Sequence, residues 1–313
     1  MEPYTFHEGP LPAGVVPDYE PAIFNWPAFA SFHHAGKTVA FYLLDDRRKK
    51  AVAEIHFQII DHLARSPFKA PFGSVEFSPG IRPELLYRFL EYFELRLKKK
   101  DVTDIYIKNP PREYAPAKLS MLETFFLNQK YTATDAEVGA VIGVSDEPFT
   151  DDIRNSERLR VRQSERAGLS FTELTAEKFS EVLEFIAKCH QEKAYKLSIT
   201  PGELEKTMRK FPGRYLLFAI RREEKMVAAS VSIRVTEKVL YNFLVNHEKE
   251  YNHLSPAVPL MEGIYAYCQR HHIQLFDLGT SALQGKPNFS LLDFKLRLGA
   301  VPSSKLSFYK KIG

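Results

Sequence analysis

Cysteine is scarce in this sequence: the two residues present, Cys189 and Cys268, lie far apart in the chain. Two cysteines are too few for a disulfide framework or a cysteine-rich zinc site, so no metal site is predicted. No run of about 18 apolar residues occurs, which argues against a transmembrane helix. The N-terminus is acidic and proline-rich and lacks the basic start and apolar run of a secretory signal. We therefore expect a cytoplasmic protein without a membrane span.

Length and charge say more than any single residue type. At 313 residues the chain is longer than one typical domain, so about two domains are predicted. Residues 1–150 carry 17 basic and 20 acidic side chains, whereas residues 151–313 carry 26 and 19, a net charge of −3 against +7. The basic half would attract an anionic ligand, but an ordinary basic surface explains this small surplus equally well.

Apolar periodicity predicts mixed α/β structure in the first half. Two β-branched and aromatic runs joined by "RRKK" indicate a hairpin over 37–46 and 51–60. A helix is predicted over 82–100, where apolar residues recur at helical spacing and lysines crowd the end. The remaining expected elements are strands at 73–77 and 102–108, a helix at 116–129, and two short strands or one long bent strand at 131–144.

The second half repeats this order, β-β-β-α-β-α-β. Three runs separated by short charged turns predict an antiparallel meander over 214–222, 225–235 and 238–246. Before it we expect a charged helix at 151–167, a strand at 169–174 and helices at 175–193 and 201–211; after it, a helix at 256–271, a strand at 274–280, a helix at 290–300 and a strand at 303–312. Two domains of one fold are therefore predicted, over 1–147 and 148–313, each a mostly antiparallel mixed sheet covered by helices.

The stretch "EYNHLSPAVPLMEGIYAY" (250–267) marks the start of one of these helices. Ser255 is expected to be the N-cap, with Pro256 at the first helical position. A helix N-terminus collects unpaired N–H groups and a partial positive charge, which suits an anion. The loop contains no glycine, however, and Pro256 removes one N–H group. Its side chains either bind a ligand or only cap the helix.

The element order, and the run from "YNFLVNHEKEYNHLSPAVPL" to "FDLGT" followed by "FSLLDFKLRLGA", resembles the GNAT acyltransferase superfamily. Two copies in one chain resemble its FemABX-like branch. The resemblance covers 151–313 at the level of motifs and 20–145 by element order. It implies a degenerate, structural first domain and a second domain that transfers an acyl or aminoacyl group from a thioester or ester to an amine.

The resemblance also implies where the donor binds. The third and fourth strands of such a sheet splay apart, and the next helix N-terminus receives the donor's phosphates. The expected donor contacts are Asn242, Leu244, Tyr251, Asn252, Ser255 and Ala257. Members that bind coenzyme A usually have glycines in this loop, because glycine lets a pyrophosphate approach the backbone. Their absence leaves two donors open: an acyl-CoA, or an aminoacyl-tRNA used on a cell-wall precursor.

Asp277 and Tyr241 are the candidate catalytic residues that the resemblance brings out. Asp277 ends a strand beside Gly279 and could deprotonate an attacking amine, or it only caps a turn or pairs with Lys295. Tyr241 could protonate the leaving group, or it only packs against a helix. Ser281 and Lys295 are candidates for binding the substrate; a solvated or ion-paired lysine is the alternative.

Five arginines in "RNSERLRVRQSERAG" (154–168) form a further basic feature. They either contact a large anionic substrate or tRNA, or belong to a solvated helix with Glu157 and Glu165. The expected acceptor is the amine of a small molecule or of a peptidoglycan-type precursor. A catalytically silent GNAT-fold binding protein is the alternative from another functional class. The sequence does not indicate the oligomeric state.

Overall fold

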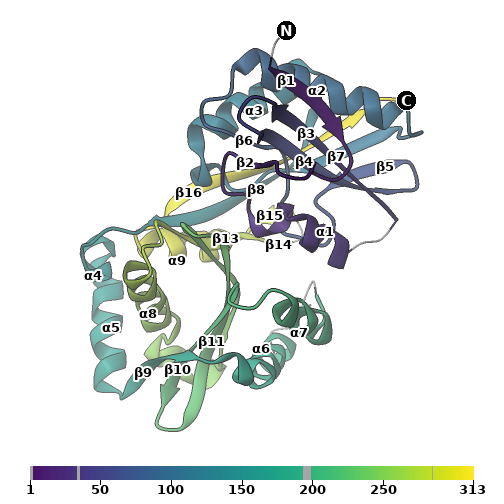
Figure 1. Cartoon of the computed structure of the whole chain (residues 1–313). Helices are drawn as coiled ribbons and strands as arrows, with labels where there is room; N and C mark the ends of the chain where they lie inside the picture. The colour runs from purple at the N-terminus through teal and green to yellow at the C-terminus, as the bar shows by residue number, and fades with distance from the viewer. Residues whose placement is uncertain (1–2, 34–35, 193–198, 284) are drawn as a thin grey trace. The chain divides into compact units, whose positions relative to one another are not determined.

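The computed structural model describes residues 3–33, 36–192, 199–283 and 285–313, and the chain divides into two compact units (Figure 1). Unit 1 is Met1–Glu137 with Ser303–Gly313, and unit 2 is Val138–Pro302. The division differs from the predicted boundary at 147/148 chiefly at the C-terminus. Strand β16 (Val301–Lys311) was expected to close the second domain, but it pairs with β7 (Asp104–Lys108) of unit 1. Periodicity predicts a strand here but does not identify its partner.

Unit 1 is built on a mixed sheet in which β1, β3, β4, β5, β7 and β16 are successive neighbours. The predicted hairpin is confirmed as β3 (Lys37–Asp45) and β4 (Lys50–Ile60), which pair antiparallel. The last predicted segment is one long strand, β8 (Thr132–Gly143), whose residues from 138 onward belong to unit 2. The sequence did not predict β1 (Tyr4–Glu8), β2 (Val16–Pro17), α1 (Pro27–Phe32) or β5 (Leu63–Ser66), and the strand expected at 73–77 is only β6 (Glu76–Phe77).

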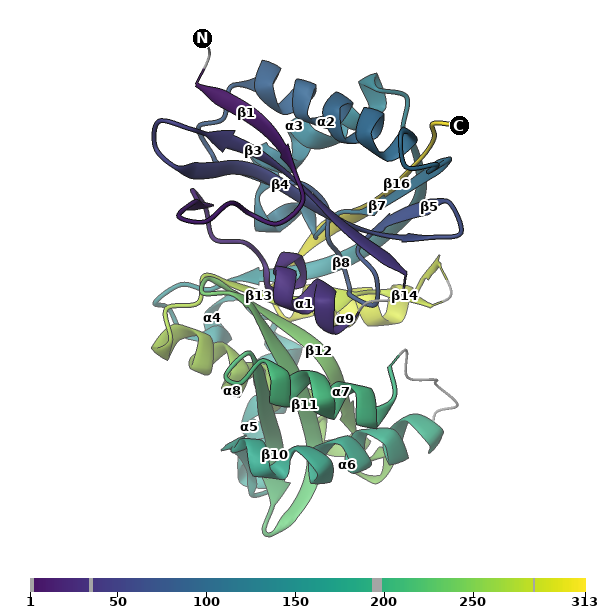
Figure 2. The same cartoon turned by 45° about the vertical axis from the view of Figure 1, so that its right-hand side comes forward.

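Helices α2 (Pro83–Lys98) and α3 (Pro116–Asn128) lie on the same face of this sheet (Figure 2). Short 3-10 turns, η1 (Ile23–Asn25) and η2 (Arg112–Tyr114), precede α1 and α3. The apolar stripe predicted for α2 is confirmed, because all six of its residues are buried in the core of unit 1: Leu85, Leu86, Phe89, Leu90, Phe93 and Leu97. This burial, rather than helix propensity, provides most of the stability of α2.

Unit 2 contains the predicted meander, β10 (Tyr215–Arg222), β11 (Lys225–Thr236) and β12 (Val239–His247), extended at one edge by β9 (Leu169–Leu174) and beyond β12 by β13 (Leu275–Thr280). Helices cover both faces of this sheet (Figure 1). One face carries α4 (Phe149–Asp152), α5 (Asn155–Arg166) and α8 (Ala257–Arg270); the other carries α6 (Phe179–Glu192) and α7 (Pro201–Lys210).

Three shorter features complete the description of unit 2. The turn η3 (Ala176–Lys178) leads into α6, and η4 (Lys249–Leu254) precedes α8. After β13, a small hairpin of β14 (Ala282–Leu283) and β15 (Lys286–Pro287) leads into α9 (Phe289–Arg297). The predicted helices and strands of this half therefore form in the predicted order, so the mixed α/β fold class is confirmed.

A cluster of titratable side chains lies inside unit 1, where the sequence indicated no site. Glu76 on β6 faces Glu54 of β4 across the ladder. Glu76 Oε1 accepts hydrogen bonds from the Ala22 N–H at 3.0 Å and from Asn25 Nδ2 at 2.6 Å. Burial, and then the charge of Glu54, raises the pKa of Glu76 to about 8, while Lys118 of α3 opposes the shift. The ionised form of Glu76 is therefore disfavoured in the folded state.

We expect the stability of unit 1 to fall as the pH rises from about 5 to about 8. Between the ordinary carboxyl pKa of 4.5 and the folded value of about 8, the folded state binds the proton that the unfolded state has lost, so each increase in pH favours unfolding. Glu76→Gln keeps an acceptor for Ala22 and removes the titration. In urea unfolding it should raise stability at pH 8 by roughly 1–3 kcal/mol and change little at pH 5. Glu84→Gln, on the exposed first turn of α2, is the control; equal pH slopes for both variants would contradict the expectation.

Candidate active site

The sheet of unit 2 opens between β12 and β13. These strands are parallel, but their ladder contains only three residue pairs, ending with Tyr241 opposite Asp277. Along its other edge β12 stays paired to β11, with a register shift at Phe243 between the Leu244 and Asn242 pairs. Backbone groups of β12 beyond Tyr241 therefore leave the ladder with β13. A gap of this kind between parallel strands exposes the main-chain groups that a ligand needs.

Asp277 and Tyr241 lie together where the two strands part. The Asp277 side chain is buried, and its Oδ1 accepts a hydrogen bond from the Gly279 N–H at 2.7 Å. Gly279 has a φ of +77°, and a Cβ at this position would lie 3.3 Å from Cε2 of Tyr241. The tyrosine ring thus lies against the Gly279 backbone, and glycine provides both the left-handed conformation and the space. The turn-capping role considered for Asp277 is present, and it fixes the carboxylate at the mouth of the gap.

Lys295 of α9 binds the backbone at the end of β13, next to Asp277. Its Nζ donates to the carbonyl oxygens of Gly279 at 2.8 Å and Thr280 at 2.9 Å, and the residue is only 6% exposed. Burial lowers the pKa of Lys295 to about 8, and the charge of Asp277 opposes that shift. The hydrogen bonds of this ammonium group are made to the backbone, and its contact with a substrate stays a prediction. Lys295 positions the turn that carries Asp277.

Ser281 follows this turn and is completely buried. Its N–H donates to the carbonyl of Val138 at 2.7 Å, and its carbonyl accepts from the Asn288 N–H at 2.8 Å. Within the described residues its hydroxyl oxygen has no hydrogen-bond partner. A buried hydroxyl without a partner is costly, so Ser281 remains a candidate for contact with a substrate or an ordered water.

Asn242 and Leu244, two of the expected donor contacts, turn their side chains into the core. Asn242 Oδ1 accepts hydrogen bonds from the hydroxyls of Ser230 and Ser232 on β11, and its Nδ2 lies 3.5 Å from the sulfur of Met261 on α8. Leu244 is 9% exposed. Only the backbone of these residues is available to a donor. The sequence could not reveal the buried polar network, because Ser230 and Ser232 look like ordinary strand residues.

Contacts with β11 and β12 hold the loop before α8. The Lys225 ammonium lies 5.0 Å from the centre of the Tyr251 ring, and Asn252 Oδ1 lies 2.8 Å from Nε2 of His247. These contacts order η4 next to the start of α8. Tyr251 and Asn252 therefore keep the backbone of the loop in place, and their contribution to donor binding stays a prediction.

Ser255 is not the N-cap of α8, so that prediction is wrong. It adopts a left-handed conformation, φ 48° and ψ 53°, and ends the η4 turn, with its N–H bonded to the Asn252 carbonyl. An N-cap side chain needs an extended backbone to reach the first helical N–H groups, which this conformation does not provide. Pro256 is the N-cap residue instead, and Ala257 begins the helix.

The start of α8 offers few donors to an anion. Pro256 and Pro259 have no N–H group. The N–H of Val258 donates to the Ser255 carbonyl at 3.0 Å, and that of Leu260 donates to the Pro256 carbonyl at 3.3 Å. In the described part of the chain, the first turn of α8 is left with the N–H of Ala257 alone for a ligand. A pyrophosphate normally uses several such groups.

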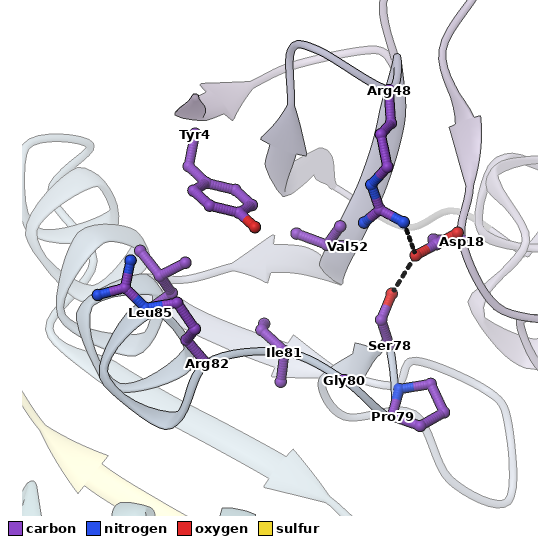
Figure 3. A pocket seen from close by; sticks show the side chains of 10 residues that line it. All are labelled: Tyr4, Asp18, Arg48, Val52, Ser78, Pro79, Gly80, Ile81, Arg82 and Leu85. Atoms are coloured by element: carbon purple, nitrogen blue, oxygen red, sulfur yellow. Dashed lines mark hydrogen bonds and ion pairs between the residues drawn. The ribbon is translucent and has the colours of Figure 1, made fainter. Parts of the chain in front are cut away.

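A small pocket in unit 1 has different chemistry. Its volume is about 170 Å³, and it lies at the start of α2 (Figure 3). Three of its polar side chains pair with one another, since Asp18 accepts from Arg48 at 3.0 Å and from Ser78 at 3.3 Å. The pocket contains no residue of the Asp277 cluster. Among the described residues, no group of three or more His, Cys, Asp or Glu side chains could hold a metal ion. None of the described helices is both long and apolar enough to cross a membrane.

Comparisons with known proteins concern the fold of the chain. Residues 152–294 match the family model described as "Acetyltransferase (GNAT) domain". No curated protein sequence matches the chain significantly. Among solved structures, FemX aligns with a TM-score of 0.68 and 11% identity over 93% of each chain. A tandem GNAT protein from the clavulanic acid biosynthesis pathway aligns with a TM-score of 0.56 and 13% identity over 99% of each chain. L-PGS from Bacillus licheniformis aligns with a TM-score of 0.55 and 14% identity over 83% of this chain and 82% of its own.

Proposed function

Because the chain has the tandem, FemABX-like GNAT fold, we propose that it is an N-acyltransferase whose reaction takes place in unit 2, at the gap between β12 and β13. The observation that carries the proposal is the position of Asp277. Its carboxylate is fixed at the point where the ladder ends, next to Tyr241. This position supports the proposal, because a carboxylate and a tyrosine on neighbouring strands, where the ladder ends, could act as base and hydroxyl donor.

The proposed chemistry is direct transfer. The neutral amine of the acceptor attacks the donor carbonyl, and a C–N bond forms while the carbonyl oxygen becomes an oxyanion. Backbone N–H groups of β12 beyond Tyr241 stabilise that charge. Asp277 takes the proton from the attacking nitrogen, directly or through a water. The bond to the leaving thiolate or alkoxide then breaks, and the Tyr241 hydroxyl protonates the departing group. The proton held by Asp277 passes to the tyrosinate through solvent, which restores both side chains.

Two donor classes are compatible with this chemistry, and different observations support each of them. The clavulanic acid pathway protein is described with reference to AcCoA, which supports a thioester donor. Within the described part of the chain, the first turn of α8 leaves one N–H for a ligand, which supports a donor that needs no pyrophosphate cradle, such as the ester of an aminoacyl-tRNA. We favour the ester, because the scarcity of N–H groups at the start of α8 is a feature of this chain. The support for a thioester comes instead from a protein only 13% identical to it. The acceptor is then an amine of a small molecule or of a peptidoglycan-type precursor.

The test is to supply both donors to the whole protein. Purified protein is incubated with a panel of amines and either labelled aminoacyl-tRNA, acetyl-CoA or a longer acyl-CoA. We expect the amine to accelerate loss of the aminoacyl ester, with little thiol release from the thioesters. Thiol release alone would overturn the choice of donor. If no donor is consumed and none shifts the melting temperature, the proposal of acyl transfer is contradicted in favour of a catalytically silent binding protein.

A further inference from the structure

The two sides of α5 in unit 2 differ in charge. The inward side of this helix is occupied by Glu157, Val161 and Ser164, all buried. Glu157 is completely buried and is neutralised by Arg160 and by Arg297 of α9. The charge on the inner side of α5 is therefore balanced within the unit, and Arg160 belongs to that internal ion pair.

The outer side of α5 has the opposite character. Arg154, Arg158, Arg162 and Arg166 recur every fourth residue, so they form one stripe that rises by about 6 Å per step. Arg158 donates to the backbone carbonyl of Asp151, a bond that does not neutralise its charge. Within the described residues, the guanidinium groups of Arg154, Arg162 and Arg166 form no ion pair. Arg154, Arg162 and Arg166 are exposed and Arg158 is half-buried, so this row of positive charge suits a polyanion.

An exposed leucine distinguishes between the polyanions. Leu159 lies beside this arginine stripe, and 64% of its surface is exposed. It precedes Arg162 by three residues, so these two side chains are neighbours on the outer face of the helix. A nucleic acid gains little from an isolated aliphatic side chain, because it is bound through phosphates and stacked bases. A lipid surface can bind both the arginines and the leucine. The arginines contact the lipid phosphates, and the leucine enters the boundary between headgroups and acyl chains.

We propose that the arginine stripe with Leu159 docks unit 2 on an anionic phospholipid surface. Arg154, Arg158, Arg162 and Arg166 contact lipid phosphates while Leu159 enters the interface. A few basic residues and one leucine give reversible attachment that weakens with salt, not permanent anchoring. The inference does not depend on the proposed transferase activity, since it concerns a different surface of unit 2.

Vesicle co-sedimentation of the full chain tests this assignment. The probes are vesicles of phosphatidylcholine alone and vesicles with about one-third phosphatidylglycerol, in low and moderate salt. We expect binding to the anionic vesicles only. The double variant Arg162→Gln/Arg166→Gln should weaken it roughly 30-fold. The matched control, Lys206→Gln/Lys210→Gln, removes the same charge from exposed positions of α7, on the other face of the unit 2 sheet, and should leave binding nearly unchanged. Circular dichroism checks that each variant is folded.

Leu159→Gln separates a lipid from a nucleic acid. The substitution keeps every charge, and we expect it to weaken vesicle binding roughly fivefold because the apolar contact is lost. A single-stranded RNA is tested in parallel. Equal binding by the double variant and its control would overturn the proposal. So would RNA binding that needs Arg162 and Arg166 but is insensitive to Leu159→Gln while anionic vesicles are not bound, because the stripe would then serve a nucleic acid.

Discussion

Replacing Asp277 with asparagine should lower the rate of acyl transfer by at least about 100-fold, because the amide cannot accept the proton of the attacking amine. The fold should survive. Asparagine still has an oxygen that can accept the Gly279 N–H, so the turn at the end of β13 keeps its geometry. The measurement is single-turnover consumption of whichever donor the protein uses, alongside the melting temperature of the variant.

The control for this experiment is Asp293→Asn. Asp293 lies on the exposed side of α9 and pairs with Arg297, so the same chemical change there alters charge without touching the gap. Its rate should match that of the original protein. Retention of more than half the rate by Asp277→Asn, with an unchanged melting temperature, would leave the carboxylate with only its turn-capping role.

The second large effect concerns packing: Gly263→Ala should destabilise unit 2. Gly263 lies on α8, and a Cβ there would stand 2.1 Å from Cδ2 of Phe171 on β9, far inside van der Waals contact. The Phe171 ring is stacked against Phe218, with centroids 5.7 Å apart, so it has little freedom to move. We expect a loss of roughly 1–3 kcal/mol, or a fall in melting temperature of about 3–10 °C.

A paired substitution identifies the cause. Removing the ring in Phe171→Ala is destabilising by itself, but it makes room for the new methyl group. The double variant should therefore be more stable than the sum of the two single changes predicts. Gly202→Ala in α7 is the control, since no atom lies within 4 Å of its added Cβ and helix propensity favours alanine. Additive effects of Gly263→Ala and Phe171→Ala would contradict the steric explanation.

Sequence reasoning predicted the order of elements well, for a physical reason. Apolar spacing directly reports which face of a helix or strand is buried, as the six core residues of α2 illustrate. Positions that depend on distant partners could not be predicted this way. The edge strand β1 begins in a proline-rich segment, and its pairing with β3 joins residues about 40 positions apart.

In the candidate site, too, features visible in the local sequence differ from features that depend on distant partners. Asp277 is a candidate from the sequence because the family resemblance points to it and a carboxylate at a strand end is visible there, and its catalytic role stays a prediction. The roles of Lys295 and Asn242 were not predicted, because each is decided by the atoms around the side chain: two backbone carbonyls for Lys295 and two serine hydroxyls for Asn242. The N-cap prediction for Ser255 is wrong because a Ser-Pro pair in a sequence is compatible both with an N-cap and with the end of a preceding turn. Only the backbone torsions show that Ser255 adopts a left-handed conformation and ends the η4 turn.

The pairing of β16 with β7 has a consequence for biosynthesis. Residues 303–313 complete unit 1, although the rest of that unit is encoded before residue 138. While the chain is being made, the strand edge of β7 therefore waits for a partner throughout the synthesis of unit 2. Unit 2 can finish folding first, even though it begins later. A fragment ending at 147 would keep that edge open, and an open strand edge invites pairing with other chains.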